Sequence, residues 1–161
     1  MNEIQIKHPY LMFLGDARDQ LAAKTADGIA YWRRDWCVGQ LRLPGCKADI
    51  GLPDLTISEA AAQGAKSLII GVVNAGGVLP DSWTESIVGA LEAGFDVASG
   101  LHMRVSENRI VRETAERLGR QLFDVRHPTQ EFATGKGTRR SGKRLLTVGT
   151  DCSIGKMYTS L

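Results

Sequence analysis

Short apolar runs alternate with segments of helical periodicity along residues 1–128 of the chain. The run from Ser67 to Val73 is almost unbroken, which is typical of a strand buried on both faces of a parallel sheet. From Asp19 to Arg34 the apolar residues recur at roughly helical spacing, which predicts a helix. We also expect strands at residues 9–16, 37–43, 95–99 and 122–125, and helices at residues 57–65, 82–94 and 107–118.

Local signals mark the ends of the later helices. Ser82, followed three residues later by Glu85, matches a capping box, and Gly94 stands where a C-terminal cap belongs. Ser106 is expected to cap the last helix, and Gly119 to end it.

This alternation predicts an α/β domain with a mainly parallel sheet over residues 1–128. In such sheets ligands bind beyond the carboxyl ends of the strands. The loops of interest are therefore Gly15–Asp16, Asn74–Gly77 and Ser99–Arg104. The two glycines after Ala75 would let the backbone approach a ligand closely.

The C-terminal part has a different composition. Residues 129–143 are polar, glycine-containing and basic, which predicts a linker; a solvated connector is a simpler interpretation than an electrostatic funnel toward a phosphate ligand. A second unit is expected from residue 144, with a strand at Leu145–Val148 that leads directly into a glycine-rich loop. A P-loop domain needs more strands and helices than residues 144–161 supply, so we expect the incomplete start of a P-loop NTPase-like domain.

The segment from Gly149 to Lys156 has the pattern of a phosphate-binding P-loop. Such a turn offers backbone N–H groups and the positive end of a helix, and Lys156 would reach the phosphate oxygens. Five residues separate Gly149 from Gly155, a spacing similar to that of dethiobiotin-synthetase-like enzymes. Met157 stands where a hydroxyl would hold Mg²⁺, and a thioether is a poor ligand for a hard cation. The sequence thus predicts phosphate binding without a metal by Gly149, Thr150, Asp151, Cys152, Ser153, Ile154, Gly155, Lys156 and Met157.

The three cysteines are widely spaced and form no CxxC pair, which predicts reduced thiols at Cys37 and Cys46 rather than a disulfide or a metal site. Cys152 lies near a helix N-terminus and Lys156, a setting that can activate a thiol. No His or Asp is visibly placed to assist it, so we favour a small residue that fits the loop.

Composition and charge narrow the class of protein. The chain has 161 residues, of which 43% are hydrophobic, enough for one domain with a core. Its net charge of +2 does not favour nucleic acid or an acidic membrane as a partner. No apolar run approaches the roughly 20 residues that span a bilayer, and no signal peptide is recognisable. We therefore expect a cytoplasmic protein.

The stretch LLTVGTDCSIGKMYTSL, with GDARDQLAAKTADGIAYWRR, GVVNAGGVLPDSW and ASGLHMRV, resembles the DgcN-type family, bacterial proteins long labelled as a domain of unknown function. The resemblance covers nearly the whole chain and implies a Rossmann-like N-terminal domain followed by a C-terminal P-loop domain. It also implies acetyl transfer from acetyl-CoA to the amino group of D-glutamate or a related acidic D-amino acid. The P-loop would then cradle a phosphate of CoA, and no metal would be needed.

Such a transfer needs a base for the amine, donors that polarise the thioester carbonyl, and cations for the substrate carboxylates. His102 is a weak candidate for the base, and Arg18 and Arg104 are candidates for the carboxylate contacts. Asn74 is a candidate donor to the ligand. Asp16 is either a base or a helix cap, and we favour the cap.

Two other functions stay open. One is a Mg-nucleotide-dependent P-loop enzyme of the dethiobiotin-synthetase type, against which Met157 argues. The other is a non-catalytic binding or oligomerisation module, with Trp32, Trp36 and Trp83 serving in a core or an interface. We expect a homo-oligomer with a small-molecule substrate.

Overall fold

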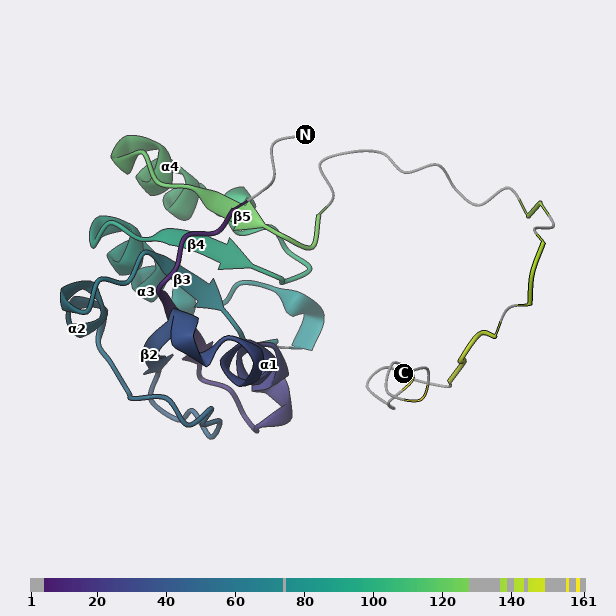
Figure 1. Ribbon diagram of the computed structural model, residues 1–161. Helices are drawn as coiled ribbons and strands as arrows, with labels where there is room; N and C mark the ends of the chain where they lie inside the picture. The colour runs from purple at the N-terminus through teal and green to yellow at the C-terminus, as the bar shows by residue number, and fades with distance from the viewer. Residues whose placement is uncertain are drawn as a thin grey trace. The chain divides into compact units, whose positions relative to one another are not determined.

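The computed structural model describes residues 5–73, 75–127, 137–138, 141–143, 145–149, 156 and 159. The chain divides into two units, Met1–Thr129 and Gln130–Leu161, and each is considered by itself. The strands and helices named below belong to the first unit (Figure 1).

The first unit is built on one sheet of five strands in the order β2-β1-β3-β4-β5 (Figure 1). Every pairing in it is parallel, so the predicted mainly parallel sheet is confirmed. All four residues of β3 are buried, as predicted for the apolar run that begins at Ser67. The strands are β1 (Tyr10–Gly15), β2 (Cys37–Arg42), β3 (Ser67–Ile70), β4 (Asp96–Ser99) and β5 (Leu122–Asp124).

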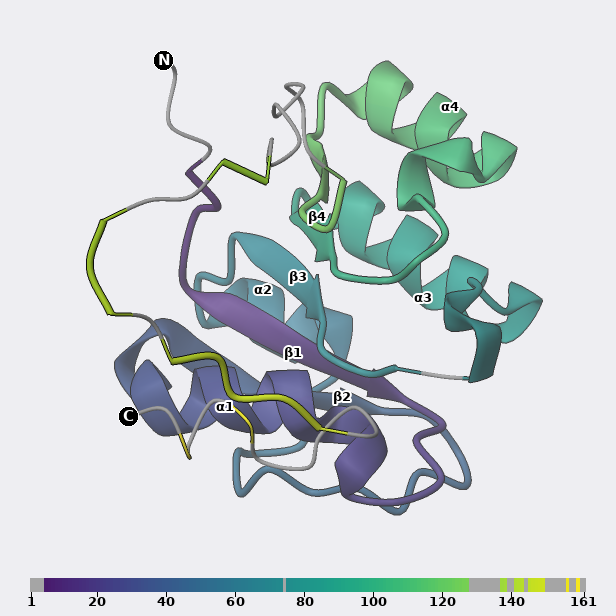
Figure 2. The same ribbon diagram turned by 90° about the vertical axis from the view of Figure 1, so that its right-hand side faces the viewer.

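Helices connect the strands and cover the sheet. They are α1 (Lys24–Trp32), α2 (Ile57–Ala62), α3 (Asp81–Glu92) and α4 (Arg109–Leu118). α1 lies on one face of the sheet, and α3 and α4 pack together on the other (Figure 2). α2 also contacts α3, because a Cβ on Gly89 would lie only 3.2 Å from Ile57 Cδ1. No helix among the described residues has the length and apolarity to cross a membrane.

Two of the predicted helix caps are wrong. α3 begins at Asp81 after Pro80, which occupies the N-cap position, so Ser82 lies inside the first turn rather than before it. α4 is capped by Asn108, whose side chain accepts from the N–H of Val111. Ser106 instead donates its hydroxyl to Asp124 over 2.6 Å, where β5 ends. Gly119 ends α4 in the left-handed conformation, as predicted.

A polar cluster ties residues 49–54 to β2. The Gln40 side chain, 1% exposed, donates to Asp49 and Asp54 over 3.0 Å each and accepts from the N–H of Ile50 over 2.9 Å. Arg42 binds Asp54 through two nitrogens, one of them over 2.7 Å. The Arg42 hydrogen bond lowers the pKa of Asp54, and bonds from the Gly51 N–H and then Gln40 lower the pKa of Asp49.

Because of this cluster, the free energy of unfolding is expected to vary with pH in the acid range. A carboxyl whose pKa is lower in the folded state stabilises the fold above its unfolded pKa, near 4, and this contribution is lost as the pH falls through the folded pKa. We expect Asp54→Asn to lower stability at pH 7 and to flatten the loss of stability below about pH 4. Urea denaturation of both proteins from pH 2 to pH 7 measures this, and parallel pH profiles would contradict it.

In the second unit, the structure assigns no strand to residues 145–149, where the sequence predicts one. Leu145, Leu146 and Val148 are 94%, 81% and 77% exposed. A strand is stabilised by pairing with a neighbour, and these residues pair with no strand of the described part of the chain.

Candidate functional site

The strand order defines where a ligand is expected. β2 lies on one side of β1, whereas β3, β4 and β5 follow on the other, so the connections leaving β1 and β3 run in opposite directions. In doubly wound sheets this switch point opens a crevice beyond the carboxyl ends of the strands. The arrowheads of β3, β4 and β5 in Figure 1 point to one edge, and β1 is parallel to β3, so this edge collects the loops after β1, β3 and β4.

The turn after β1 is held from two directions. The carbonyl of Gly15 accepts from the N–H of Leu43, and that of Ala17 accepts from the N–H of Lys47, each over 2.8 Å. Gly15 has φ +54°, and a Cβ on it would lie 2.8 Å from the indole of Trp83. Glycine therefore serves here both for the positive φ and for the close approach of the ring.

Asp16 does not cap a helix, which corrects the interpretation favoured from the sequence. Its side chain is exposed and accepts from Trp83 Nε1 over 2.8 Å. Asp19 is the residue that binds a free helical N–H, that of Ala22, over 2.8 Å. The first helical turn begins only at Leu21, so Asp16 lies before it and its carboxylate accepts from Trp83 instead.

The loop after β3 is joined to α1. Ala26 donates its N–H to the carbonyl of Gly71 over 3.0 Å, and Val73 donates to the carbonyl of Ala22 over 2.8 Å. Asn74, a predicted ligand contact, lies outside the described residues. Gly76 and Gly77 have φ of 80° and 60°, conformations that glycine adopts readily.

The loop after β4 packs against the loop after β3. A Cβ on Gly77 would lie 2.6 Å from His102 Cδ2, and Met103 donates its N–H to the carbonyl of Gly77 over 2.9 Å. The structure thus places His102, exposed, on the predicted edge. Arg18 and Arg104 lie on the loops after β1 and β4, so all three candidates lie on loops of this edge.

Other predicted contacts fall largely outside the described residues. Of the P-loop, the structure describes Gly149 and Lys156, and the roles assigned to all residues from Gly149 to Met157 stay predictions. Within the described ranges, no group of three or more His, Cys, Asp or Glu side chains could hold a metal ion. Cys37 and Cys46 are free thiols, as predicted. Burial, and then the charge of Asp35, raise the pKa of Cys37 to about 11.

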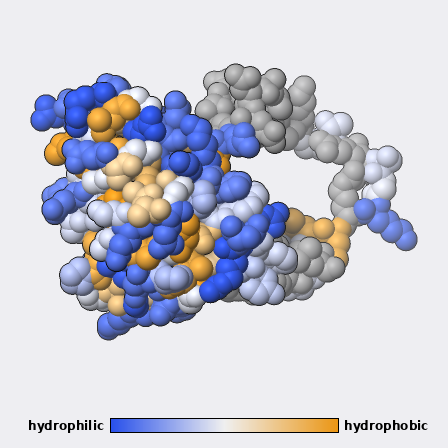
Figure 3. Space-filling model, turned by 60° about the vertical axis from the view of Figure 1, so that its left-hand side comes forward, coloured by the Kyte–Doolittle hydropathy of each residue, from blue (hydrophilic) through white to orange (hydrophobic). Residues whose placement is uncertain are grey.

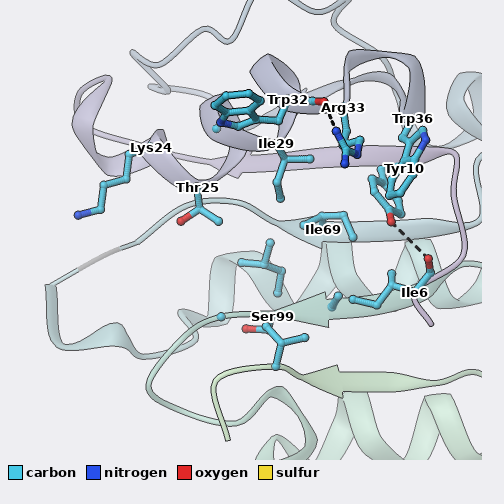
Figure 4. Close-up of a pocket in the computed structure, with 15 residues that line it drawn as sticks. Ile6, Tyr10, Lys24, Thr25, Ile29, Trp32, Arg33, Trp36, Ile69 and Ser99 are labelled. Atoms are coloured by element: carbon cyan, nitrogen blue, oxygen red, sulfur yellow. Dashed lines mark hydrogen bonds between the residues drawn. The ribbon is translucent and has the colours of Figure 1, made fainter. Parts of the chain in front are cut away.

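An open apolar pocket of about 640 Å³ lies on the α1 face of the sheet. In Figure 4, Ile29 and Trp32 line it from α1, Ile69 from β3 and Ser99 from β4. Both α1 and residues of β3 and β4 line the pocket, so part of this face of the sheet borders it directly. On the side of the molecule shown in Figure 3, apolar residues form patches that hydrophilic residues interrupt.

The three tryptophans lie in different environments. Trp83 is 1% exposed and packs edge-on against Phe13, with ring centroids 5.5 Å apart. Trp32 is 72% exposed, and the half-buried Trp36 stacks on His8 at 4.7 Å. Trp83 is therefore a core residue, and its hydrogen bond with Asp16 is a long-range contact that the sequence pattern did not reveal.

Comparison with known proteins identifies the two parts of the chain. Residues 41–128 match DUF1611_N, a domain of unknown function described as a Rossmann-like domain, and residues 131–161 match DUF1611_C, described as a P-loop domain. The chain is also similar to the crystal structure of a DUF1611 family protein from Anabaena variabilis, with a TM-score of 0.71 and 24% identity over 98% of this chain and 48% of that one.

Two curated relatives are more similar in sequence. A D-glutamate N-acetyltransferase of Tritonibacter scottomollicae is 54% identical over 97% of this chain and 47% of its own length. A D-glutamate N-acetyltransferase of a Pseudoalteromonas species is 49% identical over 98% of this chain and 48% of its own length. The chain thus spans about half the length of the curated relatives that it matches.

Proposed function

Since this chain belongs to the DUF1611 family, with a Rossmann-like domain followed by P-loop domain sequence, we propose that it forms part of a D-glutamate N-acetyltransferase. The observation that carries the proposal is the 54% and 49% identity, over nearly the whole chain, to relatives with that name. Identity at this level over a domain that includes the loops at the carboxyl edge of the sheet supports a shared substrate class.

The proposed acetyl donor is acetyl-CoA. In the reaction, the neutral amine attacks the thioester carbonyl, an N–C bond forms, the C–S bond breaks, the amine proton passes to a base, and CoA leaves as the thiol. The phosphates of CoA are anions that suit a P-loop with Lys156, and Met157 is compatible with a grip that uses no Mg²⁺.

The proposed site for the amino acid is the carboxyl edge of the sheet. Arg18 and Arg104 lie on loops of that edge and carry the charge that substrate carboxylates require. His102, which packs against Gly77, is the candidate base. These assignments are proposals for the full-length protein.

The proposal predicts that the full-length protein releases a free thiol from acetyl-CoA when D-glutamate is added. A thiol-reactive dye follows the release, and mass spectrometry of the product should show N-acetylglutamate. Reactions without the amino acid serve as the control. Hydrolysis of Mg²⁺–ATP without acetyl transfer would overturn the proposal and favour the nucleotide-dependent alternative.

A further inference from the structure

Asp16 is an exposed carboxylate in the turn after β1 that a buried side chain holds by a hydrogen bond. Backbone hydrogen bonds from Leu43 and Lys47 hold the residues on either side of it, and Trp83 Nε1 holds its Oδ1 at 2.8 Å. The indole that makes this contact is 1% exposed and packed against Gly15. The carboxylate is therefore fixed by the core rather than by mobile surface groups.

The hydrogen bond from Trp83 occupies only part of the bonding capacity of this carboxylate. An indole N–H is a neutral donor, so it orients the group without compensating the negative charge. A carboxylate has about four acceptor positions, and Trp83 uses one of them. Among the described residues, no Lys or Arg forms an ion pair with Asp16. By contrast, Asp19 on the same loop uses its carboxylate for the N–H of Ala22.

We propose that Asp16 binds the ammonium group of the amino-acid substrate and that Trp83 is the residue that positions it. This inference rests on the proposed function. An acidic amino acid carries one cation and two anions, and the edge offers one fixed carboxylate with Arg18 and Arg104 on its loops. A charge-assisted bond between Asp16 and the ammonium group would orient the nitrogen, which then loses a proton to the base and attacks the acetyl group as the neutral amine.

A purely structural role for Asp16 is the competing explanation, since its contact with Trp83 joins the turn after β1 to α3. Asp16→Asn separates the two roles, because the amide oxygen can still accept from Trp83 Nε1 while the charge is lost. In the full-length enzyme we expect this variant to raise the KM for D-glutamate at least about tenfold and to leave the KM for acetyl-CoA within about twofold. Asp27→Asn, which removes the same charge from the surface of α1, should change neither value.

Trp83→Phe tests the positioning role. Phenylalanine keeps an aromatic ring beside Phe13 and removes the N–H, so the KM for D-glutamate should rise about threefold or more, with a smaller change for acetyl-CoA. Equal changes in both constants would indicate a general loss of structure and would contradict the assignment of Trp83.

A binding measurement distinguishes failure of this inference from failure of the proposed function. Calorimetry of the full-length protein should show that D-glutamate binds at least about tenfold more tightly than glutarate, which has both carboxylates and no ammonium group. Asp16→Asn should abolish that preference. If wild-type protein transfers no acetyl group yet shows the Asp16-dependent preference for D-glutamate over glutarate, the proposed function is wrong and the proposed binding site is supported. If Asp16→Asn keeps both the preference for D-glutamate and the wild-type KM for D-glutamate, the role of Asp16 is purely structural and the inference is wrong.

Discussion

Gly71→Ala is expected to lower the free energy of unfolding by about 3 kcal/mol, the upper end of the usual cost of an overpacked core. A Cβ at residue 71 would lie 2.4 Å from Ala26 Cβ and 2.9 Å from Ala26 Cα. These atoms belong to the backbone and the first side-chain carbon of a helical residue, so no side-chain rotation can relieve the clash. The hydrogen bond from Ala26 to the Gly71 carbonyl fixes the same two segments together, so α1 must shift away from β3.

Urea denaturation followed by tryptophan fluorescence measures this effect, because all three tryptophans lie in the first unit. Gly28→Ala is the matched control. Gly28 lies within α1, and a Cβ added there would meet no atom within 4 Å, so alanine should stabilise the protein by about 0.5–1 kcal/mol. An unchanged midpoint for Gly71→Ala would show that α1 is not held so closely against the end of β3.

Lys156→Ala in the full-length protein is expected to weaken the binding of CoA by about 10- to 100-fold, the range that corresponds to one hydrogen bond to a charged group. The reason is the proposed contact of the Lys156 ammonium group with CoA phosphate oxygens. Calorimetry with CoA measures the affinity, and thermal unfolding without ligand checks that the fold is kept.

Lys143→Ala provides the comparison for that experiment. Lys143 is exposed in the predicted linker and carries the same charge as Lys156. Removing that charge should reduce CoA affinity only about twofold, through the weaker long-range attraction between the protein and the CoA phosphates. Equal losses in the two variants would mean that CoA responds to overall charge, and wild-type affinity in Lys156→Ala would show that the P-loop is not the coenzyme site.

The sheet could be predicted from the sequence because each strand is a short apolar run that can be recognised by itself. The run that begins at Ser67 became β3, and the segment of helical spacing before Arg34 contains α1. Helix starts were less predictable, because the pattern of a hydroxyl followed three residues later by Glu occurs at more than one place. Thr56 and Glu59 form a true capping box, which was not predicted, whereas Ser82 and Glu85 do not begin α3, since Pro80 holds the N-cap position.

The candidate site was only partly predictable for a different reason. The position of the loops could be predicted because parallel strands direct their carboxyl ends to one edge. This rule applies without any knowledge of side-chain contacts. The partner of Asp16 lies 67 positions away, and no local pattern connects the two. A carboxylate after a strand is usually interpreted as a cap, and only the packing of Trp83 under Gly15 shows otherwise.

The position of β3 at the centre of the sheet has a consequence for synthesis on the ribosome. Tyr10 of β1 pairs with Ser67 of β3, so the inner pair of strands cannot form until the whole connection between them has been translated and has left the exit tunnel. Among the described strands, no consecutive two form a hairpin that would shelter the nascent chain earlier, because every pairing is parallel. β1 can pair with β2 earlier, but the edge of β1 that faces β3 stays unpaired for several seconds more at ordinary rates of about 5–20 residues per second.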